Sequence, residues 1–186
     1  MDDKQRVRAS KFLSKHLRHQ PAALGLTLED GGWVSIDALL AGCQKAGLPL
    51  TPDDLAEIVA TSDKQRFAFD ETGDRIRANQ GHSVDVDLLL EPSKPPARLF
   101  HGTPERFVPA ILREGLRKMS RHHVHLSADA ATATRVGARR GRPVVLAIDA
   151  AAMFAAGHLF FVSANAVWLT DRVPPEFLRV VEGPNA

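Results

Sequence analysis

The stretch Glu91-Pro92-Ser93-Lys94-Pro95-Pro96-Ala97 divides the 186-residue chain near its middle. Three prolines within seven residues cannot continue a helix or a central strand, because proline lacks a backbone N–H and has a fixed φ. We interpret the stretch as a linker and expect two lobes, residues 1–91 and residues 97–186. The length of the chain suits two small domains of this size.

Before the linker, the sequence predicts three helices followed by a β-hairpin. Apolar residues at helical spacing predict a helix over about Lys4–His19, and two further helices are expected over Ile36–Ala46 and from Thr51 to about Ala60. Arg66–Asp70 and Arg75–Ala78 alternate in polarity around a turn, which is the pattern of a hairpin. Three helices and a hairpin favour a winged-helix arrangement for this lobe.

After the linker, short strands alternate with two helices. The helices are expected over Pro104–Glu114, closed by Gly115, and over Asp129–Arg139. The strand signals are Arg98–His101, His123–Ser127, Val144–Ile148, Leu159–Val162 and Ala166–Leu169. Several short strands with few helices predict a mixed α+β lobe.

The composition limits the class of protein. Hydrophobic residues make up 44% and charged residues 25%, which is typical of a globular chain. No apolar run approaches the roughly 20 residues that span a bilayer, and a basic N-terminal helix stands where a signal core would be. Cys43 is the single cysteine, so it forms no internal disulfide and is interpreted as a packing residue. We therefore expect a cytoplasmic protein without membrane contact, and a monomer.

Charge is distributed unevenly along the chain. Residues 1–90 carry eleven basic and fourteen acidic side chains, whereas residues 91–186 carry thirteen basic and eight acidic ones. From Lys4 to His19 there are six Lys or Arg residues and no carboxylate, and five share one face: Lys4, Arg8, Lys11, Lys15 and Arg18. This stripe and the basic loop Gly137–Pro143 suit an RNA backbone, although solvated surfaces have the same pattern.

Two pairs of polar residues in the first lobe are candidates for phosphate chemistry. Arg18 and His19 end the basic helix; a guanidinium fork matches phosphate oxygens, and an imidazole can transfer a proton near neutral pH. Lys64 and Arg66 alternate, so they can share one face of the first hairpin strand. The alternatives are a solvated helix end, where the dipole favours cations, and an exposed strand start.

Two motifs in the second lobe are also candidates. His101-Gly102-Thr103 is expected at a strand end, where glycine lets a ligand approach the backbone; alternatively, Thr103 caps the helix that follows. Three histidines after Arg121 suggest zinc at first sight, but no Asp, Glu or Cys lies among them, and we favour a polar pocket wall. If Arg121 begins a strand, His123 and His125 share its face.

Six segments, taken together and in this order, resemble the RNA 2′-phosphotransferase family, whose members act last in eukaryotic tRNA splicing. The resemblance covers nearly the whole chain. The matching segments are Leu13-Ser14-Lys15 through Leu17-Arg18-His19, Asp63-Lys64-Gln65-Arg66-Phe67, Ala78-Asn79-Gln80-Gly81-His82-Ser83, His101-Gly102-Thr103, Met119-Ser120-Arg121 through His123-Val124-His125-Leu126-Ser127, and Val167-Trp168-Leu169-Thr170.

The resemblance implies a fold and a set of roles. It implies a winged-helix RNA-binding lobe, followed by a lobe with the ADP-ribosyltransferase fold that binds NAD⁺. The implied catalytic residues are Arg18, His19, Arg66 and Arg121. The implied NAD⁺-binding residues are His101, Gly102, Thr103, His125 and Ser127, and we add Lys11, Lys15 and Lys64 as contacts to RNA. Val167 stands near the position where other ADP-ribosyltransferases often have Glu, which argues against ordinary protein ADP-ribosylation.

The reaction implied by the resemblance has two steps and consumes NAD⁺ as a co-substrate. An internal 2′-phosphate of a tRNA-like RNA displaces nicotinamide, giving RNA-2′-phospho-ADP-ribose. The neighbouring ribose hydroxyl then attacks the phosphate, giving 2′-OH RNA and ADP-ribose 1″,2″-cyclic phosphate. We expect no metal, because arginines and a histidine can supply the charge stabilisation. The alternatives are an ADP-ribosyltransferase that acts on nucleic-acid phosphate ends and a non-catalytic winged-helix nucleic-acid-binding protein.

Overall fold

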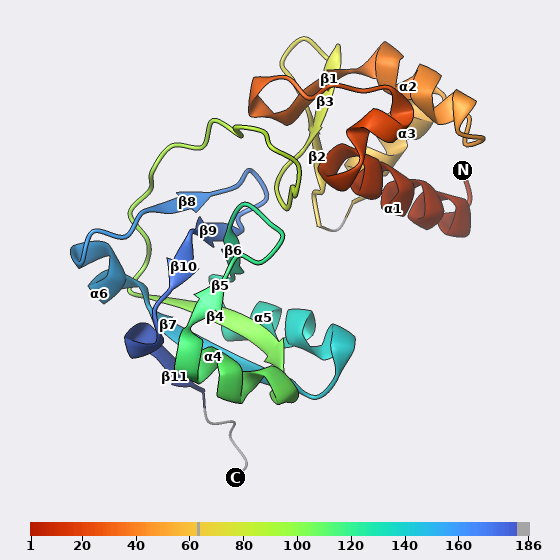
Figure 1. Ribbon diagram of the computed structural model, residues 1–186. Helices are drawn as coiled ribbons and strands as arrows, with labels where there is room; N and C mark the ends of the chain where they lie inside the picture. Colours follow the sequence, from red (N-terminus) through yellow and green to blue (C-terminus); the bar gives the residue numbers. More distant parts are fainter. Residues whose placement is uncertain (63, 182–186) are drawn as a thin grey trace. The chain divides into compact units, whose positions relative to one another are not determined.

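A computed structural model describes residues 1–62 and 64–181, and the side chain of Arg140 lies outside this description. The chain divides into two compact units, unit 1 (Met1–Leu90) and unit 2 (Glu91–Ala186). Both combine helices with small antiparallel sheets (Figure 1), which confirms the expected mixed α and β composition. No helix among the described residues is long and apolar enough to cross a membrane.

Unit 1 contains the three predicted helices. Helix α1 (Asp3–His19) begins after Asp2, whose carboxylate accepts the backbone N–H of Gln5 in a capping box. Helix α2 is Ile36–Lys45, and helix α3 (Pro52–Ala60) follows a capping box of its own. Two 3₁₀ turns are Pro21–Leu24 and Asp30–Gly32. The three helices lie where the sequence predicts them, because capping residues mark their starts and apolar residues recur at helical spacing.

The sheet of unit 1 has three antiparallel strands in the order β1-β3-β2. Strands β2 (Phe67–Phe69) and β3 (Arg75–Ala78) form the predicted hairpin. Strand β1 (Trp33–Ser35) was not predicted, since three residues are too few to show an alternating pattern, and it pairs Val34 with Ile76. The hairpin therefore becomes the central and one outer strand of a sheet.

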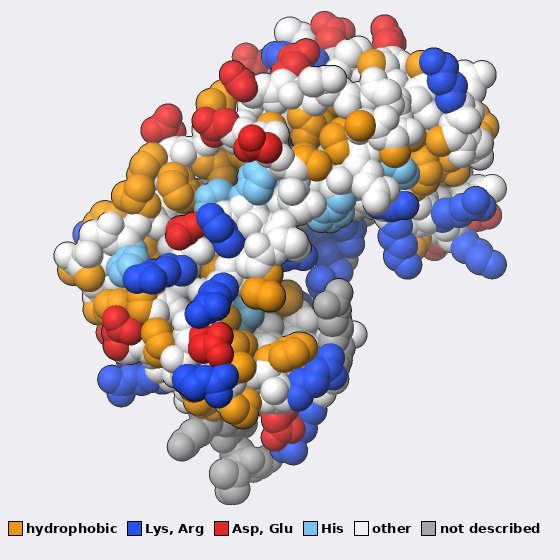
Figure 2. Space-filling view, in the orientation of Figure 1, with side chains coloured by type: hydrophobic (Ala, Val, Ile, Leu, Met, Phe, Trp, Pro, Cys, Tyr) orange, Lys and Arg blue, Asp and Glu red, His pale blue; other side chains and the backbone are white. Residues whose placement is uncertain are grey.

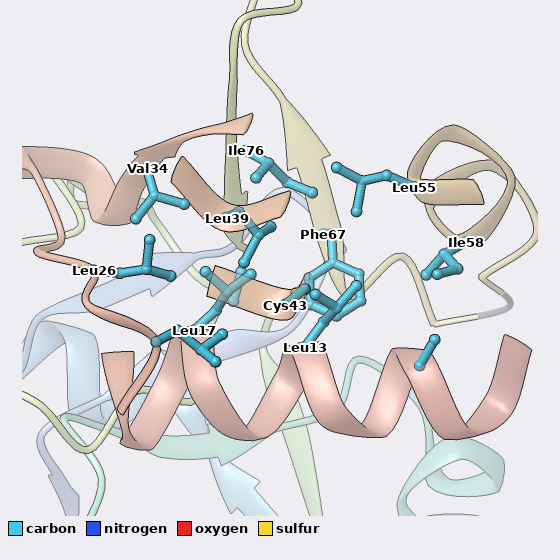
Figure 3. Packing of buried hydrophobic residues seen from close by; sticks show 13 residues of the cluster. Leu13, Leu17, Leu26, Val34, Leu39, Cys43, Leu55, Ile58, Phe67 and Ile76 are labelled. Atoms are coloured by element: carbon cyan, nitrogen blue, oxygen red, sulfur yellow. The ribbon is translucent and has the colours of Figure 1, made fainter. Parts of the chain in front are cut away.

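One face of α1 packs against this sheet and the other helices. Leu13 and Leu17 are fully buried, and in Figure 3 they point toward Leu39, Cys43 and Phe67. Burying one such leucine stabilises a fold by roughly 1.5–3 kcal/mol. Cys43 is a packing residue, as expected, and its burial raises the pKa of the thiol to about 11.

Unit 2 is built from three small antiparallel sheets. Their strand orders are β11-β7-β4, β6-β9-β8 and β10-β5. The strands are β4 (Arg98–Pro104), β5 (Leu116–Arg117), β6 (Val124–Leu126), β7 (Pro143–Asp149), β8 (Phe160–Val162), β9 (Trp168–Thr170), β10 (Arg172–Val173) and β11 (Leu178–Val180). The helices are α4 (Val108–Glu114), α5 (Ala130–Gly137) and α6 (Ala150–Ala155), with 3₁₀ turns at Glu105–Phe107, Ala138–Arg140 and Pro175–Phe177.

Strand β4 is longer than the sequence predicts. It pairs with β7 along its whole length, from Arg98 opposite Asp149 to Pro104 opposite Pro143. The motif His101-Gly102-Thr103 therefore lies inside a strand, and its expected place at a strand end was wrong. The prediction that one helix covers Pro104–Glu114 was also wrong, because a 3₁₀ turn precedes α4. Since α4 is preceded by Phe107, Thr103 does not cap it.

Candidate functional site

In unit 1, the basic stripe lies on the exposed side of α1. Lys11 and Lys15 are exposed, while Leu13 and Leu17 occupy the buried side of the same helix. In Figure 2, Lys and Arg side chains follow the edge of the unit that α1 forms. Exposed ammonium groups at this spacing can contact successive phosphates without losing hydration in the free protein.

Arg18 and His19 end α1 as predicted. Arg18 is half-buried and His19 is exposed. The Nδ1 atom of His19 lies 2.8 Å from the Oγ atom of Ser83, which is a hydrogen-bond distance. The backbone N–H of Ser83 also donates to the carbonyl oxygen of Arg18, at 2.9 Å. The end of the helix is therefore held by a residue 64 positions later in the sequence.

Lys64 and Arg66 lie in a loop, and the expectation that they share a strand face was wrong. Strand β2 begins only at Phe67, because Gln65 adopts a left-handed conformation with φ of 41° and interrupts the extended backbone. Lys64 is exposed and Arg66 is half-buried. Asp63, which belongs to the same motif, lies outside the described residues.

Asn79 holds the loop that carries Arg66. Its backbone N–H donates to the carbonyl oxygen of Arg66 at 2.9 Å, and its side-chain amide donates to the carbonyl oxygen of Gln65 at 2.5 Å. Together with Ser83, Asn79 belongs to the segment Ala78–Ser83, whose residues had no predicted role. The sequence feature that could have indicated Asn79 and Ser83 is their polar side chains, which come directly after a predicted strand. Their contacts to Arg18, His19 and Arg66 are visible only in the fold.

In unit 2, His101, His125 and Arg121 form a connected group. The Nδ1–H of His101 donates to the carbonyl oxygen of His125 at 3.0 Å, since a carbonyl can only accept. Arg121 donates from Nη1 to Nδ1 of His125 at 3.3 Å, so this ring nitrogen carries no proton. Arg121 lies in a bend before β6, not in the strand that we considered, yet it reaches His125.

The environment of His101 keeps its ring uncharged. Burial lowers the pKa of His101 below its ordinary value, the hydrogen bond to His125 opposes this, and the positive charge of Arg121 lowers it further. Burial also lowers the pKa of His123, whose ring lies tilted against that of Phe161, with 5.5 Å between centroids. Residues 1–62 and 64–181 contain no cluster of three His, Cys, Asp or Glu side chains placed to hold a metal ion.

Gly102 is a glycine because α5 packs directly on β4. A Cβ atom at this position would lie 1.7 Å from the carbonyl oxygen of Ala133. The prediction that Gly102 lets a ligand approach the backbone was therefore wrong, because helix α5 fills this space. Thr103 is buried beside it, and Ser127 exchanges two backbone hydrogen bonds with Phe100, which joins β4 to the end of β6.

The basic loop Gly137–Pro143 combines a helix end with exposed arginines. Gly137 is buried against β4. Arg139 and Arg142 are exposed, and the Nη1 atom of Arg142 lies 3.8 Å from a carboxylate oxygen of Glu105. An exposed pair at this distance adds little stability, so the loop keeps the character of a solvated basic surface.

These features define a protein that handles phosphate groups. Unit 1 presents guanidinium, ammonium and imidazole groups, which are suited to binding phosphate oxygens. Unit 2 presents a wall of uncharged histidines beside one arginine.

Comparison with known proteins identifies the family. The model of the RNA 2′-phosphotransferase, Tpt1 / KptA family matches residues 4–172. A probable RNA 2′-phosphotransferase of Streptomyces coelicolor is 59% identical over 179 residues, which cover 96% of this chain and 97% of the relative. Another, of Nostoc punctiforme, is 58% identical over 181 residues, which cover 97% of this chain and all of the relative. The chain belongs to the RNA 2′-phosphotransferase family and is an enzyme, which confirms the resemblance.

Proposed function

We propose that the enzyme transfers an internal RNA 2′-phosphate to NAD⁺ in two steps. The products are 2′-OH RNA, nicotinamide and ADP-ribose 1″,2″-cyclic phosphate. The observation that carries the proposal is the family match over residues 4–172, which includes every predicted site residue. The relatives carry RNA 2′-phosphotransferase in their names, and the NAD⁺ requirement is supported by the uncharged polar groups of unit 2.

In the first step, an oxygen of the 2′-phosphate attacks the ribose carbon that holds nicotinamide. The glycosidic bond breaks, nicotinamide leaves with the bonding electrons, and RNA-2′-phospho-ADP-ribose forms. Arg18 and Arg66 orient the phosphate, because a guanidinium fork fixes the direction of two phosphate oxygens. His19 donates a further hydrogen bond to this group.

In the second step, the neighbouring ribose hydroxyl attacks phosphorus. The bond between phosphorus and the RNA 2′-oxygen breaks, and the proton lost by the hydroxyl is balanced by one gained by the RNA 2′-oxygen. Negative charge builds on the non-bridging oxygens, where Arg121 stabilises it. His19 is the group suited to moving the proton.

The residues proposed for NAD⁺ fit its chemistry. Nicotinamide in NAD⁺ is positively charged, and a buried charged histidine would repel it. The lowered pKa of His101 removes that repulsion at neutral pH. His125, Thr103 and Ser127 offer uncharged partners to ribose hydroxyls and the carboxamide, while Gly102 lets β4, which carries Thr103, pack closely against α5.

We also propose that unit 1 is a winged-helix RNA-binding lobe and that unit 2 has the ADP-ribosyltransferase fold. Three helices with a three-stranded antiparallel sheet support the former. Small antiparallel sheets that carry the His101 and His125 motifs support the latter. Lys11, Lys15 and Lys64 are exposed and contact the backbone of a tRNA-like RNA in this proposal.

One incubation tests the proposed function. Purified protein is mixed with a 2′-phosphorylated oligonucleotide, with and without NAD⁺ and with and without EDTA. We expect loss of the 2′-phosphate only with NAD⁺, no effect of EDTA, and equal amounts of nicotinamide and ADP-ribose cyclic phosphate. Release of inorganic phosphate without NAD⁺ contradicts the proposal, and accumulation of ADP-ribosylated RNA as the final product favours the alternative ADP-ribosyltransferase.

A further inference from the structure

The segment Asn79–Ser83 follows β3 and contacts three predicted site residues: the backbones of Arg18 and Arg66 and the side chain of His19. We propose that it is a positioning element. Ser83 fixes the orientation of the His19 ring, and Asn79 helps to fix the direction in which the side chain of Arg66 leaves the backbone. The proposal rests on the proposed function for the roles of these two residues. None of the residues in the segment is proposed to touch a substrate.

Ser83 holds the end of α1 in two ways. The last carbonyl groups of a helix lack partners within the helix, and the Ser83 N–H satisfies that of Arg18 at 2.9 Å. With its backbone fixed there, its hydroxyl meets Nδ1 of His19 at 2.8 Å. This contact orients the His19 ring, because the Ser83 hydroxyl can donate to Nδ1 or accept from it and so binds the ring in either tautomer.

Asn79 holds a strained loop. Gln65 has φ of 41°, a left-handed conformation that residues with a Cβ atom rarely adopt. Two hydrogen bonds from Asn79, one to Gln65 and one to Arg66, keep the chain in this conformation. Asn79 is only 6% exposed, so water does not compete well for either bond. Ser62 supports the same turn from the other side, since its hydroxyl accepts the N–H of Arg66 at 3.4 Å and its carbonyl oxygen accepts that of Gln65 at 3.0 Å. Asn79 therefore contributes to the direction in which Arg66 leaves the backbone.

The middle of the segment anchors these two contacts. His82 is 1% exposed and packs beside Gly32, where an added Cβ atom would lie 3.4 Å from the imidazole. Gly81 has φ of 88°, and an added Cβ atom would lie 3.8 Å from the side chain of Arg18. The buried His82 anchors the segment between Asn79 and Ser83.

The Ser83 contact is tested with Ser83→Ala and Ser83→Thr. We expect Ala to lower the single-turnover rate of 2′-phosphate removal about tenfold at saturating RNA and NAD⁺, with unchanged RNA affinity. Thr, which keeps the hydroxyl, should restore the rate to within about threefold of the parent. Ser93→Ala, at a serine outside the segment whose hydroxyl donates to the carbonyl oxygen of Glu91 at 3.4 Å, is the matched control and should behave as the parent.

A spectroscopic measurement separates this proposal from the proposed function. With ¹⁵N-labelled histidine, we expect the ring-nitrogen signals of His19 to shift in Ser83→Ala and to return in Ser83→Thr. This readout needs no turnover, so it still tests Ser83 if the parent enzyme shows no reaction with NAD⁺. Unchanged His19 signals in Ser83→Ala, or equal slowing by Ala and Thr, overturns the role of Ser83.

The Asn79 contact is tested by a double-mutant cycle. If Asn79 acts through Arg66, Asn79→Ala slows the parent about tenfold but has no further effect in an Arg66→Ala background. A structural role would slow both backgrounds equally and would overturn the assignment. Thermal unfolding is measured alongside, and if Asn79→Ala does not fold, Asn79→Ser, which retains a short donor, takes its place in the same cycle.

Discussion

Unit 1 and unit 2 hold their predicted site residues by different means. In unit 1, Arg18, His19 and Arg66 lie at a helix end and in a loop, are exposed or half-buried, and depend on hydrogen bonds from Asn79 and Ser83. In unit 2, His101 and His125 lie inside strands and are joined through a backbone carbonyl. The cations of unit 1 thus lie at or near the surface, with Arg18 and Arg66 half-buried, whereas the half-buried His101 of unit 2 is kept neutral.

This difference follows from the cost of burying charge. A cation that stays hydrated until a phosphate arrives costs the folded protein little, but its geometry must be fixed by neighbours. A buried imidazole is fixed by its strand, but it is stable only in the uncharged form. We therefore expect substitutions in unit 1 to alter rates and affinities, and substitutions in the strands of unit 2 to alter folding.

Arg121 breaks this division, because it is an exposed cation of unit 2 beside a neutral histidine. We expect Arg121→Ala to slow the second step by about 10²–10³, the usual cost of losing one contact to developing negative charge. RNA-2′-phospho-ADP-ribose should then accumulate in single-turnover time courses resolved on gels. Lys64→Ala should slow the same step to a smaller extent.

Lys118→Ala is the control for Arg121→Ala. Lys118 lies in the same turn, where its carbonyl oxygen accepts the N–H of Arg121, and its ammonium group contacts Asp171 at 2.7 Å. We expect the Lys118→Ala variant to remove the 2′-phosphate at the parental rate, without accumulation of an intermediate. If Arg121→Ala slows both steps equally and no intermediate is seen, Arg121 acts in binding or in the first step, and our assignment is wrong.

Gly102→Ala tests whether the strands of unit 2 respond through folding. The new Cβ atom would lie 1.7 Å from a backbone oxygen of α5, which cannot move without breaking the helix contact. We expect a loss of about 3 kcal/mol in the free energy of unfolding. Gly73→Ala is the control, because an added Cβ there meets nothing within 4 Å, although φ is 79°; it should cost about 1 kcal/mol. Equal costs would show that α5 does not constrain β4.

Acid should affect the two units in different ranges of pH. The pKa of His101 is lowered by burial, so below its ordinary value of about 6.5 the unfolded chain binds a proton that the folded unit does not. Unit 2 should therefore lose stability as the pH falls from about 6.5. Hydrogen bonds from Arg75 lower the pKa of Asp70 to about 2, so this contribution to unit 1 persists until the pH falls below about 4 and is lost toward 2.

The two tryptophans allow the pH dependence of stability to be measured separately for each unit. Trp33 lies in unit 1 and Trp168 in unit 2, and they are the only two in the chain. Unfolding is followed by fluorescence in Trp168→Phe and in Trp33→Phe across this range of pH. His101→Asn keeps a donor for the His125 carbonyl but cannot titrate, so it should reduce the acid loss of unit 2. An identical pH dependence in both units contradicts the comparison.

The sequence predicts helices better than it predicts the small sheets. Asp2, Thr51 and the apolar spacing of α1 mark helix ends and faces locally, and all three helices of unit 1 were confirmed. Strands β1, β5 and β10 have two or three residues, and their existence depends on partners far along the chain. The length of β4 likewise comes from its pairing with β7, which no local pattern shows.

The candidate site shows the same limit. Residue types and order indicated Arg18, His19 and Arg66, because phosphate chemistry requires such groups. Asn79 and Ser83 were not assigned, since their roles depend on hydrogen bonds across 14 and 64 positions of sequence. Gly102 was assigned to ligand access, because the approach of α5 cannot be seen without the fold.

The smallest expected effect concerns the basic stripe of α1, and it asks whether the exposed cations of unit 1 act on RNA at all. In Lys11→Glu/Lys15→Glu, two cations on one helix face become anions, while the buried side of α1 is untouched. If each lysine neutralises one phosphate, the slope of log affinity against log salt should fall by about 1.4, since each contact to a single strand contributes about 0.7. The Michaelis constant for RNA should rise several-fold at low salt, with little change in turnover. Lys45→Glu/Lys94→Glu changes the net charge equally at exposed positions outside the stripe, and should leave the slope near that of the parent. If both double variants show the same slope, the stripe is only a solvated helix face, and the cations of unit 1 that matter for RNA are confined to the half-buried Arg18 and Arg66 and their neighbours.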